Sequence, residues 1–282
     1  MKKALSEVIQ GDRCGEELAT LGERLECLSC GHSIPLQGAV PIFTPPPEGI
    51  QPSEKLVRGP EVGTPWRQAN WRFLEEQISS LPDEALILDV GAGRGDFADL
   101  FQERNYLALD VYPYPEVDIV CDLTQTNPFR EGSFDAILLM NVLEHVYDTH
   151  ALLSRLAKML KHGGALLVAI PFMVKMHQVP IDFVRYTHFA LGRLGREDGL
   201  EVESLEGYYD PVFFLGEGVG NLKWSVLPTI RGTRHYVGRA LLGGIQVLNQ
   251  ALQRVVGPGV TQPPSKMRSL APTGYQIVYR KN

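Results

Sequence analysis

The sequence predicts an α/β fold with a doubly wound, mostly parallel sheet that has helices on both faces. Residues 86–101, LILDVGAGRGDFADLF, have the pattern of a strand, a glycine-rich turn and a helix. Further apolar runs typical of buried strands follow at 106–111, 117–123, 134–143 and 163–172. Because acidic residues recur at the ends of these runs, we expect a ligand site along the carboxyl edge of the sheet.

Three glycines at alternate positions follow the first strand. They are Gly91, Gly93 and Gly95. Glycine lets the backbone take positive φ and lets a ligand approach the main chain closely. Asp89 precedes them, and Asp96 takes the sixth position, where a dinucleotide site has its third glycine. Because Asp96 would repel a pyrophosphate, the pattern favours a ligand with a cation or hydroxyls. A turn with a purely structural role is the alternative.

Acidic residues also end the second and third strands. Asp110 lies 15 residues beyond Gly95, as a β-α-β unit requires. A carboxylate there can accept hydrogen bonds from both hydroxyls of a ribose, and each such charged bond contributes about 1.5–3 kcal/mol. Asp122 ends the third strand and is placed to meet an adenine amino group. Together these positions indicate a nucleoside ligand.

A set of motifs resembles those of the class I S-adenosylmethionine-dependent methyltransferases: ILDVGAGRG, LALDV, CDL, SFDAILLMNVLEHV and a Gly-Gly pair before the fifth strand. The resemblance runs from about residue 66 to residue 186 and returns at the C-terminus. It implies that the cofactor is S-adenosylmethionine. It also implies that the methionine part is held by Asp89, Gly91, Gly93 and Gly95. Asp110 would then bind the ribose with Val111 beside the adenine, and Asp122 and Leu123 would lie at the adenine edge. Asn141 and Val142 would form the floor of the site.

The resemblance further implies a seven-stranded sheet, with a sixth strand at 200–205 and an antiparallel last strand at 274–280. A helix at 66–80 should lead into the first strand. We therefore expect four parts: a zinc-ribbon-like head at 1–44, a Pro-rich linker at 45–65, a methyltransferase domain at 66–210 and 271–282, and a basic helical insertion at 211–270.

The head contains one C-x-x-C-G turn, formed by Cys27 and Cys30, and a further cysteine, Cys14. It resembles the zinc-ribbon heads that precede some methyltransferases of this family. Tetrahedral zinc requires four ligands, but Gly11 stands where a fourth cysteine would be. Either Asp12 or His32 completes the set of ligands, or the ribbon has lost its metal and persists as a hairpin cap.

Apolar residues spaced three and four apart predict one amphipathic helix in the insertion: Val237, Leu241, Ile245, Leu248, Leu252 and Val255. Residues 218–282 carry nine Lys and Arg and no Asp or Glu. This asymmetry indicates either an anionic partner or packing of the tail on the acidic body. The helix either packs on its own domain or contacts a membrane surface peripherally.

Candidate catalytic residues follow the fourth and fifth strands. His145 belongs to a Glu-His pair that resembles one beside the cofactor in the family, and its alternative role is to bond the backbone. The segment HQVPIDFVRYT resembles one in family members of surface-polysaccharide or lipid-linked sugar pathways. There Asp182 and Arg185 either pair with each other or form part of a lid over the acceptor, with Arg185 on an anionic group. His177 and His188 are the other candidate bases.

The sequence thus predicts transfer of a methyl group from S-adenosylmethionine to a small-molecule acceptor, such as a sugar or a lipid-linked glycan precursor. Two alternatives stay open: a non-catalytic scaffold with this fold and a nicotinamide-dependent oxidoreductase. A protein acceptor also stays open. No nucleic-acid partner is expected, because the body is acidic and NVLE stands where base methyltransferases carry a Pro-Pro motif. Four cysteines, no 18-residue apolar run and no apolar signal core predict a cytoplasmic location.

Overall fold

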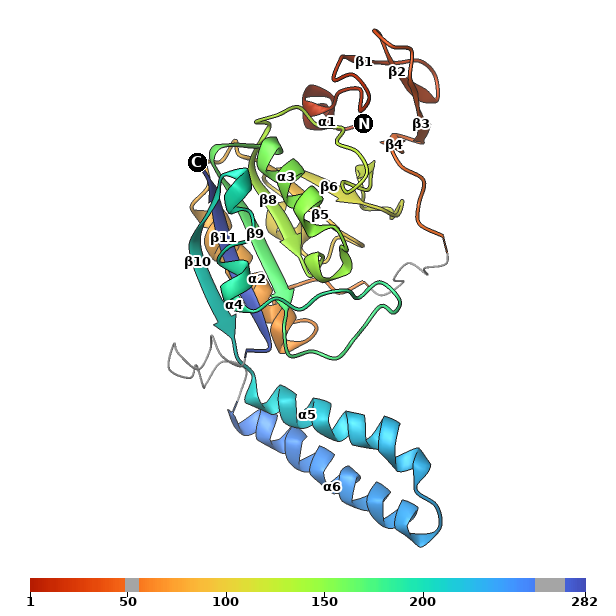
Figure 1. The fold of residues 1–282 in the computed structure, drawn as a ribbon, viewed down its shortest axis with the longest axis vertical. Helices are drawn as coiled ribbons and strands as arrows, with labels where there is room; N and C mark the ends of the chain where they lie inside the picture. The colour runs from red at the N-terminus through yellow and green to blue at the C-terminus, as the bar shows by residue number, and fades with distance from the viewer. Residues whose placement is uncertain (49–55, 257–271) are drawn as a thin grey trace.

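The computed structural model describes residues 1–48, 56–256 and 272–282 of the 282-residue chain. A seven-stranded sheet in the order β10-β11-β9-β8-β5-β6-β7 forms the body (Figure 1). Strands from β9 to β7 in this order pair in parallel, whereas β11 is antiparallel to β9 and β10. The strands span Leu86–Val90 (β5), Asn105–Asp110 (β6), Ile119–Val120 (β7), Phe134–Met140 (β8), Leu160–Pro171 (β9), Leu200–Tyr208 (β10) and Gly274–Lys281 (β11).

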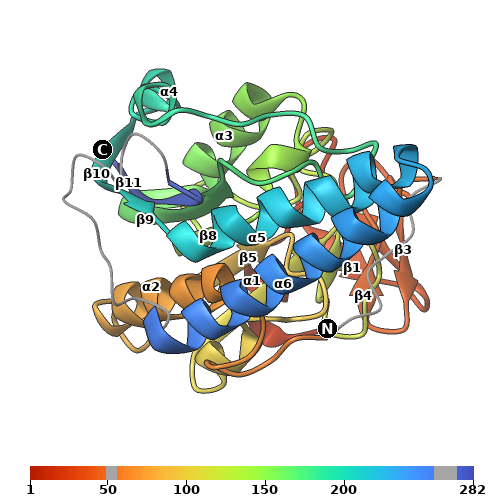
Figure 2. The ribbon, with the colours of Figure 1, turned by 90° about the horizontal axis from the view of Figure 1, so that it is seen from below.

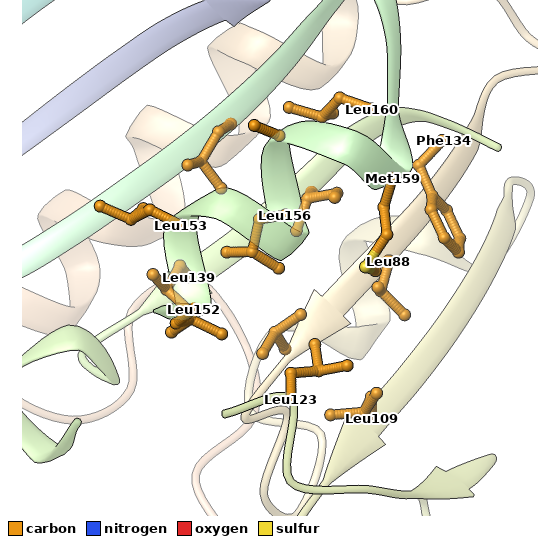
Figure 3. Packing of buried hydrophobic residues seen from close by; sticks show 14 of the residues in the cluster. Leu88, Leu109, Leu123, Phe134, Leu139, Leu152, Leu153, Leu156, Met159 and Leu160 are labelled. Carbon is orange, nitrogen blue, oxygen red and sulfur yellow. The ribbon is translucent and has the colours of Figure 1, made fainter. Parts of the chain in front are cut away.

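Helices cover both faces of this sheet, which confirms the predicted doubly wound fold. Helix α2 (Pro65–Ser79) begins where the Thr64 hydroxyl accepts a hydrogen bond from a backbone N–H of the first turn and proline takes the first helical position. It packs on one face, whereas α1 (Lys3–Val8) and α3 (Thr149–Met159) pack on the other. Figure 3 shows leucines of α3 packed over residues of β5 and β8. The sheet is therefore buried on both faces, as its apolar runs predict.

Three elements are shorter than the sequence predicts. β7 is limited to two residues, because Asp118 Oδ2 accepts the Ala108 N–H at 2.9 Å in place of a ladder carbonyl. β8 ends before Asn141, where φ of 56° turns the chain out of the sheet. The helix expected after the glycine turn is also short. Nine residues lie between Gly95 and the start of β6, and within them the chain forms a single 3₁₀ turn, η1 (Ala98–Phe101).

The N-terminal head forms its own antiparallel sheet and packs against the edge of the main one. The head strands are Leu18–Thr20 (β1), Arg24–Cys27 (β2), Ser33–Gln37 (β3) and Val40–Pro41 (β4). Ile42 bridges Val120 of β7, and Leu25 and Ile34 join the core on the α3 face. The head thereby covers an edge strand that would otherwise be open. The predicted domain boundaries stay a prediction, and residues 49–55 of the expected linker lie outside the described residues.

Past β9 the structure has α4 (His188–Leu191), η3 (Arg196–Asp198) and β10, and the insertion then forms a helical hairpin. Its elements are α5 (Pro211–Asn221), a π-helical turn (Leu222–Val226), a 3₁₀ turn (Leu227–Thr229) and α6 (Thr233–Val256). Figures 1 and 2 show α5 and α6 lying side by side, and Figure 1 shows the pair extending from the body.

The predicted amphipathic helix corresponds to α6. Its apolar stripe does not pack on the described part of the body: Leu241 is 63% exposed and Leu248 is 65% exposed. Residues 257–270 of the expected insertion lie outside the described residues. Within the part of the chain that the structure describes, we find no helix with the length and apolarity needed to span a bilayer.

Candidate functional site

The glycine turn connects β5 to η1 at the carboxyl edge of the sheet. All three of its glycines have positive φ, between 56° and 75°. A Cβ on Gly91 would lie 2.4 Å from Cγ2 of Val142, which follows β8, so only glycine fits there. A Cβ on Gly93 would meet no described atom within 4 Å. The turn is therefore closed against the chain at Gly91 and open to a ligand at Gly93.

Asp110, at the end of β6, holds this turn in place. Its Oδ2 accepts the Gly93 N–H at 2.8 Å and its Oδ1 accepts the Tyr112 N–H at 3.0 Å. The carboxylate is only 7% exposed, and burial raises its pKa. The backbone of Val111 also contacts this carboxylate. Because a carboxylate has about four acceptor positions, acceptor capacity is left for a ligand hydroxyl. Val111 follows directly in the chain, at the predicted adenine position.

The Asp89 carboxylate is engaged within the protein. It is 2% exposed, and its Oδ2 accepts a hydrogen bond of 2.7 Å from the Tyr106 hydroxyl. Burial raises the pKa of Asp89 to about 7. Its predicted contact with the methionine part of the cofactor stays a prediction.

This raised pKa predicts how stability depends on pH. The unfolded Asp89 carboxyl has a pKa of about 3.9, so between about pH 4 and pH 7 the folded state binds the proton more tightly. The unfolding free energy of the cofactor-free protein should therefore fall as pH rises through this window, by up to about 1.4 kcal/mol per unit of raised pKa. Asp89→Asn removes this loss. In urea titrations the unfolding free energy of the variant should therefore rise relative to that of wild type between pH 4 and pH 8. Parallel pH curves for the two proteins would contradict the assignment, and Asp83→Asn, at an exposed carboxylate, should keep the wild-type slope.

At the third strand, the Asp122 side chain caps a turn. Its Oδ1 accepts the backbone N–H of Thr124 at 2.9 Å and the Thr124 hydroxyl at 2.6 Å, and its Oδ2 accepts Gln125 Nε2 at 2.6 Å. Leu123 is buried in the core. The predicted role of this pair at an adenine edge stays a prediction, because the carboxylate already has a structural one.

Asn141 and Val142 lie beside the turn, as the predicted floor of the site. Asn141 Oδ1 accepts the indole N–H of Trp66 from α2 at 2.7 Å. Trp66 in turn lies 5.5 Å, centroid to centroid, from the ring of Tyr208 at the end of β10. These contacts join α2, β8 and β10 around one corner of the site.

Sequence reasoning missed Arg67, which ties the described end of the linker to the glycine turn. Its guanidinium donates to the carbonyl oxygens of Val57 at 2.9 Å, Gly59 at 2.6 Å and Val62 at 3.0 Å, and also to that of Asp96. The side chain is nearly buried. An arginine in the first turn of a helix gives no signal for such a role, because its acceptors are backbone atoms of a segment without regular structure.

The candidate acceptor residues after β8 and β9 form one cluster, except for His188. The rings of His145 and His177 lie 4.9 Å apart, centroid to centroid, with the buried Glu144 between their Nε2 atoms at 3.7 Å from each. The Glu144 carboxylate raises the pKa of His177. His188 instead packs on Phe189 in α4, and its role as a base stays a prediction.

Asp182 and Arg185 pair with each other, as one of the two interpretations of the sequence has it. Arg185 donates through both terminal nitrogens to the Asp182 carboxylate, with one of these bonds at 2.8 Å. This pairing lowers the pKa of Asp182 to about 2. Asp182 Oδ2 also accepts the His177 N–H at 2.8 Å. The pair therefore fixes the position of His177.

The three predicted metal ligands of the head lie together. Cys14 Sγ is 3.2 Å from Cys27 Sγ and 3.4 Å from Cys30 Sγ. A Cβ on Gly11 would lie 3.2 Å from Cys27 Sγ, so the missing fourth cysteine would have faced this cluster. His32 Nε2 and Asp12 Oδ1 lie 3.5 Å from each other, and within the described chain neither joins the three sulfurs as a ligand group. The donor set fits zinc at three of its four positions.

Comparisons with known proteins place the glycine turn and the cluster of Glu144, His145 and His177 in a common domain. The family model described as "Methyltransferase domain" matches residues 66–205. The chain is 33% identical over 110 residues to methyltransferase str2 of Strobilurus tenacellus, covering 34% of this chain and 40% of that protein. It is 31% identical over 130 residues to the tRNA U34 carboxymethyltransferase of Syntrophotalea carbinolica, covering 40% of each. The chain thus matches about two fifths of the length of these curated relatives.

Solved structures also resemble the chain. A SAM-dependent methyltransferase from Archaeoglobus fulgidus aligns with a TM-score of 0.48 at 16% identity, over 76% of this chain and 94% of that one.

Proposed function

We propose that this chain, which belongs to the class I S-adenosylmethionine-dependent methyltransferases, transfers the methyl group of S-adenosylmethionine to a small-molecule acceptor. The observation that carries the proposal is the position of Asp110. Its carboxylate fixes the open side of the glycine turn through Gly93 and lies at the strand end where ribose hydroxyls would bind it. A ribose next to a positively charged methionine part fits this arrangement, because the Asp110 carboxylate ends β6 beside the turn.

When bound, S-adenosylmethionine supplies a methyl group on a positively charged sulfur, so the protein needs no nucleophile of its own. The work of the chain is to bind and orient, and orientation can supply roughly 7–11 kcal/mol of a barrier. Asp110 would bind the ribose, and the open side of the turn at Gly93 would admit the methionine part. Arg67 would keep the segment from Val57 to Val62 against the turn and exclude water.

The acceptor would meet the cluster of Glu144, His145 and His177. A hydroxyl acceptor has to lose its proton during transfer, and this cluster is the group of titratable side chains next to the predicted floor at Asn141 and Val142. The pair of Asp182 and Arg185 positions His177 for this role.

Single substitutions in the cluster should separate turnover from cofactor binding. We expect His145→Ala and His177→Ala to lower the turnover number at least tenfold, because they remove groups on the acceptor side, with little change in affinity for S-adenosylhomocysteine. The measurement is release of S-adenosylhomocysteine with a panel of acceptors. His150→Ala, an exposed histidine on α3, is the matched control. Unchanged turnover in both cluster variants would reject the proposed acceptor site. A wild-type protein that binds cofactor but methylates no acceptor would instead favour the scaffold alternative.

The acceptor class is part of the proposal. We favour a sugar or lipid-linked glycan precursor, because the apolar stripe of α6 is exposed and residues 218–282 are basic. Peripheral attachment to an anionic membrane, tested by co-sedimentation with phosphatidylserine vesicles, fits this choice. Several relatives have names that place their action on tRNA, so tRNA belongs in the acceptor panel. The acidic body favours the small molecule.

We further propose that the head binds zinc through Cys14, Cys27 and Cys30. Zinc would join the segment before β1 to the end of β2 and to the turn after it, and the position next to Gly11 would be left to a non-protein ligand. Elemental analysis of protein purified without chelator should find one equivalent of zinc, and a value far below one would reject this site.

A further inference from the structure

The Glu144 carboxylate is buried without a hydrogen bond. The residue is 0% exposed, and neither carboxylate oxygen accepts a hydrogen bond from any residue that the structure describes. The Nε2 atoms of His145 and His177 lie 3.7 Å from Glu144 Oε1, beyond hydrogen-bond distance. A buried charge is strongly unfavourable unless a counter-charge or a metal compensates it. Within the described residues no hydrogen bond compensates this carboxylate, and a cation held between it and the two imidazoles would be the missing partner.

Both histidines are oriented so that one nitrogen is left for that partner. His145 Nδ1 lies 2.6 Å from the carbonyl oxygen of Ile181, and His177 Nδ1 bonds the carbonyl oxygen of Lys175 at 3.4 Å. Asp182 Oδ2 also lies 3.2 Å from His177 Nδ1. A ring N–H donated to a carbonyl or a carboxylate fixes the tautomer and leaves the lone pair on Nε2. Both Nε2 atoms are on the side of Glu144, and that of His145 has no hydrogen-bond partner in the described chain.

The spacing of the three ligand atoms suits a small divalent ion. One atom from each of the three side chains lies within 4.8 Å of the other two, and the two Glu-to-His separations are 3.7 Å. Two ligands at about 2.1 Å from a tetrahedral ion lie about 3.4 Å apart. A shift of a few tenths of an ångström would bring each of the two Glu-to-His separations to this value.

We propose that Glu144, His145 and His177 bind a first-row divalent transition-metal cation. Two imidazoles and one carboxylate suit such ions and leave coordination positions open. Asp182, itself held by Arg185, would act as the outer partner that orients His177. The ligands come from the loops after two neighbouring strands, β8 and β9, so the fold brings them together at the carboxyl edge.

A cation there would also serve the acceptor, and this part rests on the proposed function. The site follows directly on Asn141 and Val142, next to the glycine turn. An acceptor hydroxyl that coordinates the ion has a lowered pKa. With both Nε2 atoms on the ion, the proton of the hydroxyl would pass to solvent and not to a histidine. The oxygen–methyl bond would form while the sulfur–methyl bond breaks and its electron pair stays on sulfur.

The test is a titration of the full-length, chelator-treated protein with Mn²⁺, followed by the electron paramagnetic resonance signal of the free ion, and with Co²⁺ in a parallel series. Thiolates are poor ligands for Mn²⁺, and a Cys14→Ser variant shows whether the head contributes. We expect about one bound Mn²⁺ per chain in wild type. Glu144→Gln and His177→Ala should lose the site, and Asp182→Asn should weaken it about 10–100-fold. His150→Asn, on the exposed side of α3, should bind as wild type does.

Two results would overturn the proposal: wild type that binds neither ion, or binding by Glu144→Gln as tight as in wild type. Should the buried Glu144 variant fail to fold, the partly exposed His177 variant decides in the same way. Binding of S-adenosylhomocysteine, measured on the same samples, reports on the proposed function separately. Ion binding without nucleoside binding would leave the metal site in place and reject only the proposed function.

Discussion

Gly91→Ala is expected to abolish measurable cofactor binding and to lower the unfolding free energy by roughly 2–5 kcal/mol. Two physical effects add. The residue has φ of 75°, a conformation that is less favourable by about 1–2 kcal/mol for an L-residue with a side chain. The new Cβ would also lie 2.4 Å from Val142 Cγ2, so the turn or the floor of the site has to move. Urea unfolding and calorimetry with S-adenosylhomocysteine measure the two consequences.

Two further variants separate strain from collision. Gly93→Ala has φ of 56° but no described atom within 4 Å of the new Cβ, so it should lose only about 1–2 kcal/mol. Adding Val142→Ala to Gly91→Ala should restore the part of the unfolding free energy that the contact between the new Cβ and Val142 removes. A Gly91→Ala protein with the wild-type urea midpoint would contradict the placement of the turn against Val142.

Asp110→Ala is expected to weaken binding of S-adenosylhomocysteine at least about 100-fold. The substitution removes two proposed bonds to ribose hydroxyls, each contributing about 1.5–3 kcal/mol. It also frees the Gly93 N–H that the carboxylate accepts at 2.8 Å, so the turn loses its anchor. Isothermal calorimetry measures the affinity. Asp110→Asn keeps one acceptor oxygen, so its affinity should lie between those of wild type and Asp110→Ala.

The control for Asp110 is Asp83→Ala, which removes an exposed carboxylate away from the turn and should bind as wild type does. Circular dichroism of each variant checks that the fold is retained. An Asp110→Ala protein that is folded and binds within threefold of wild type would reject the ribose assignment.

The sheet and the glycine turn could be predicted because their signals are local. Apolar runs mark β5, β6, β8 and β9, and glycine marks the positions whose φ no other residue takes easily. β7 could not be bounded, because a side-chain bond from Asp118 replaces part of its ladder. The residue pattern around Asp118 does not indicate that its side chain replaces a backbone partner in the strand.

Contacts between distant segments account for what the sequence could not predict. His145 and His177 were separate candidates, and only the pairing of β8 with β9 brings them to Glu144. A buried glutamate after a strand is visible in the sequence as the Glu-His pair, but its burial is not. The role of Arg67 could not be predicted for a similar reason, since it bonds backbone carbonyl oxygens that no residue type specifies. The exposure of the α6 stripe also depends on where the hairpin lies.

Calorimetric titration of the folded wild-type protein with S-adenosylmethionine and with S-adenosylhomocysteine tests the central claim most directly. The account predicts saturable binding of both nucleosides at one site per chain. A protein that circular dichroism shows to be folded, and that releases or absorbs no heat with either nucleoside, would contradict it.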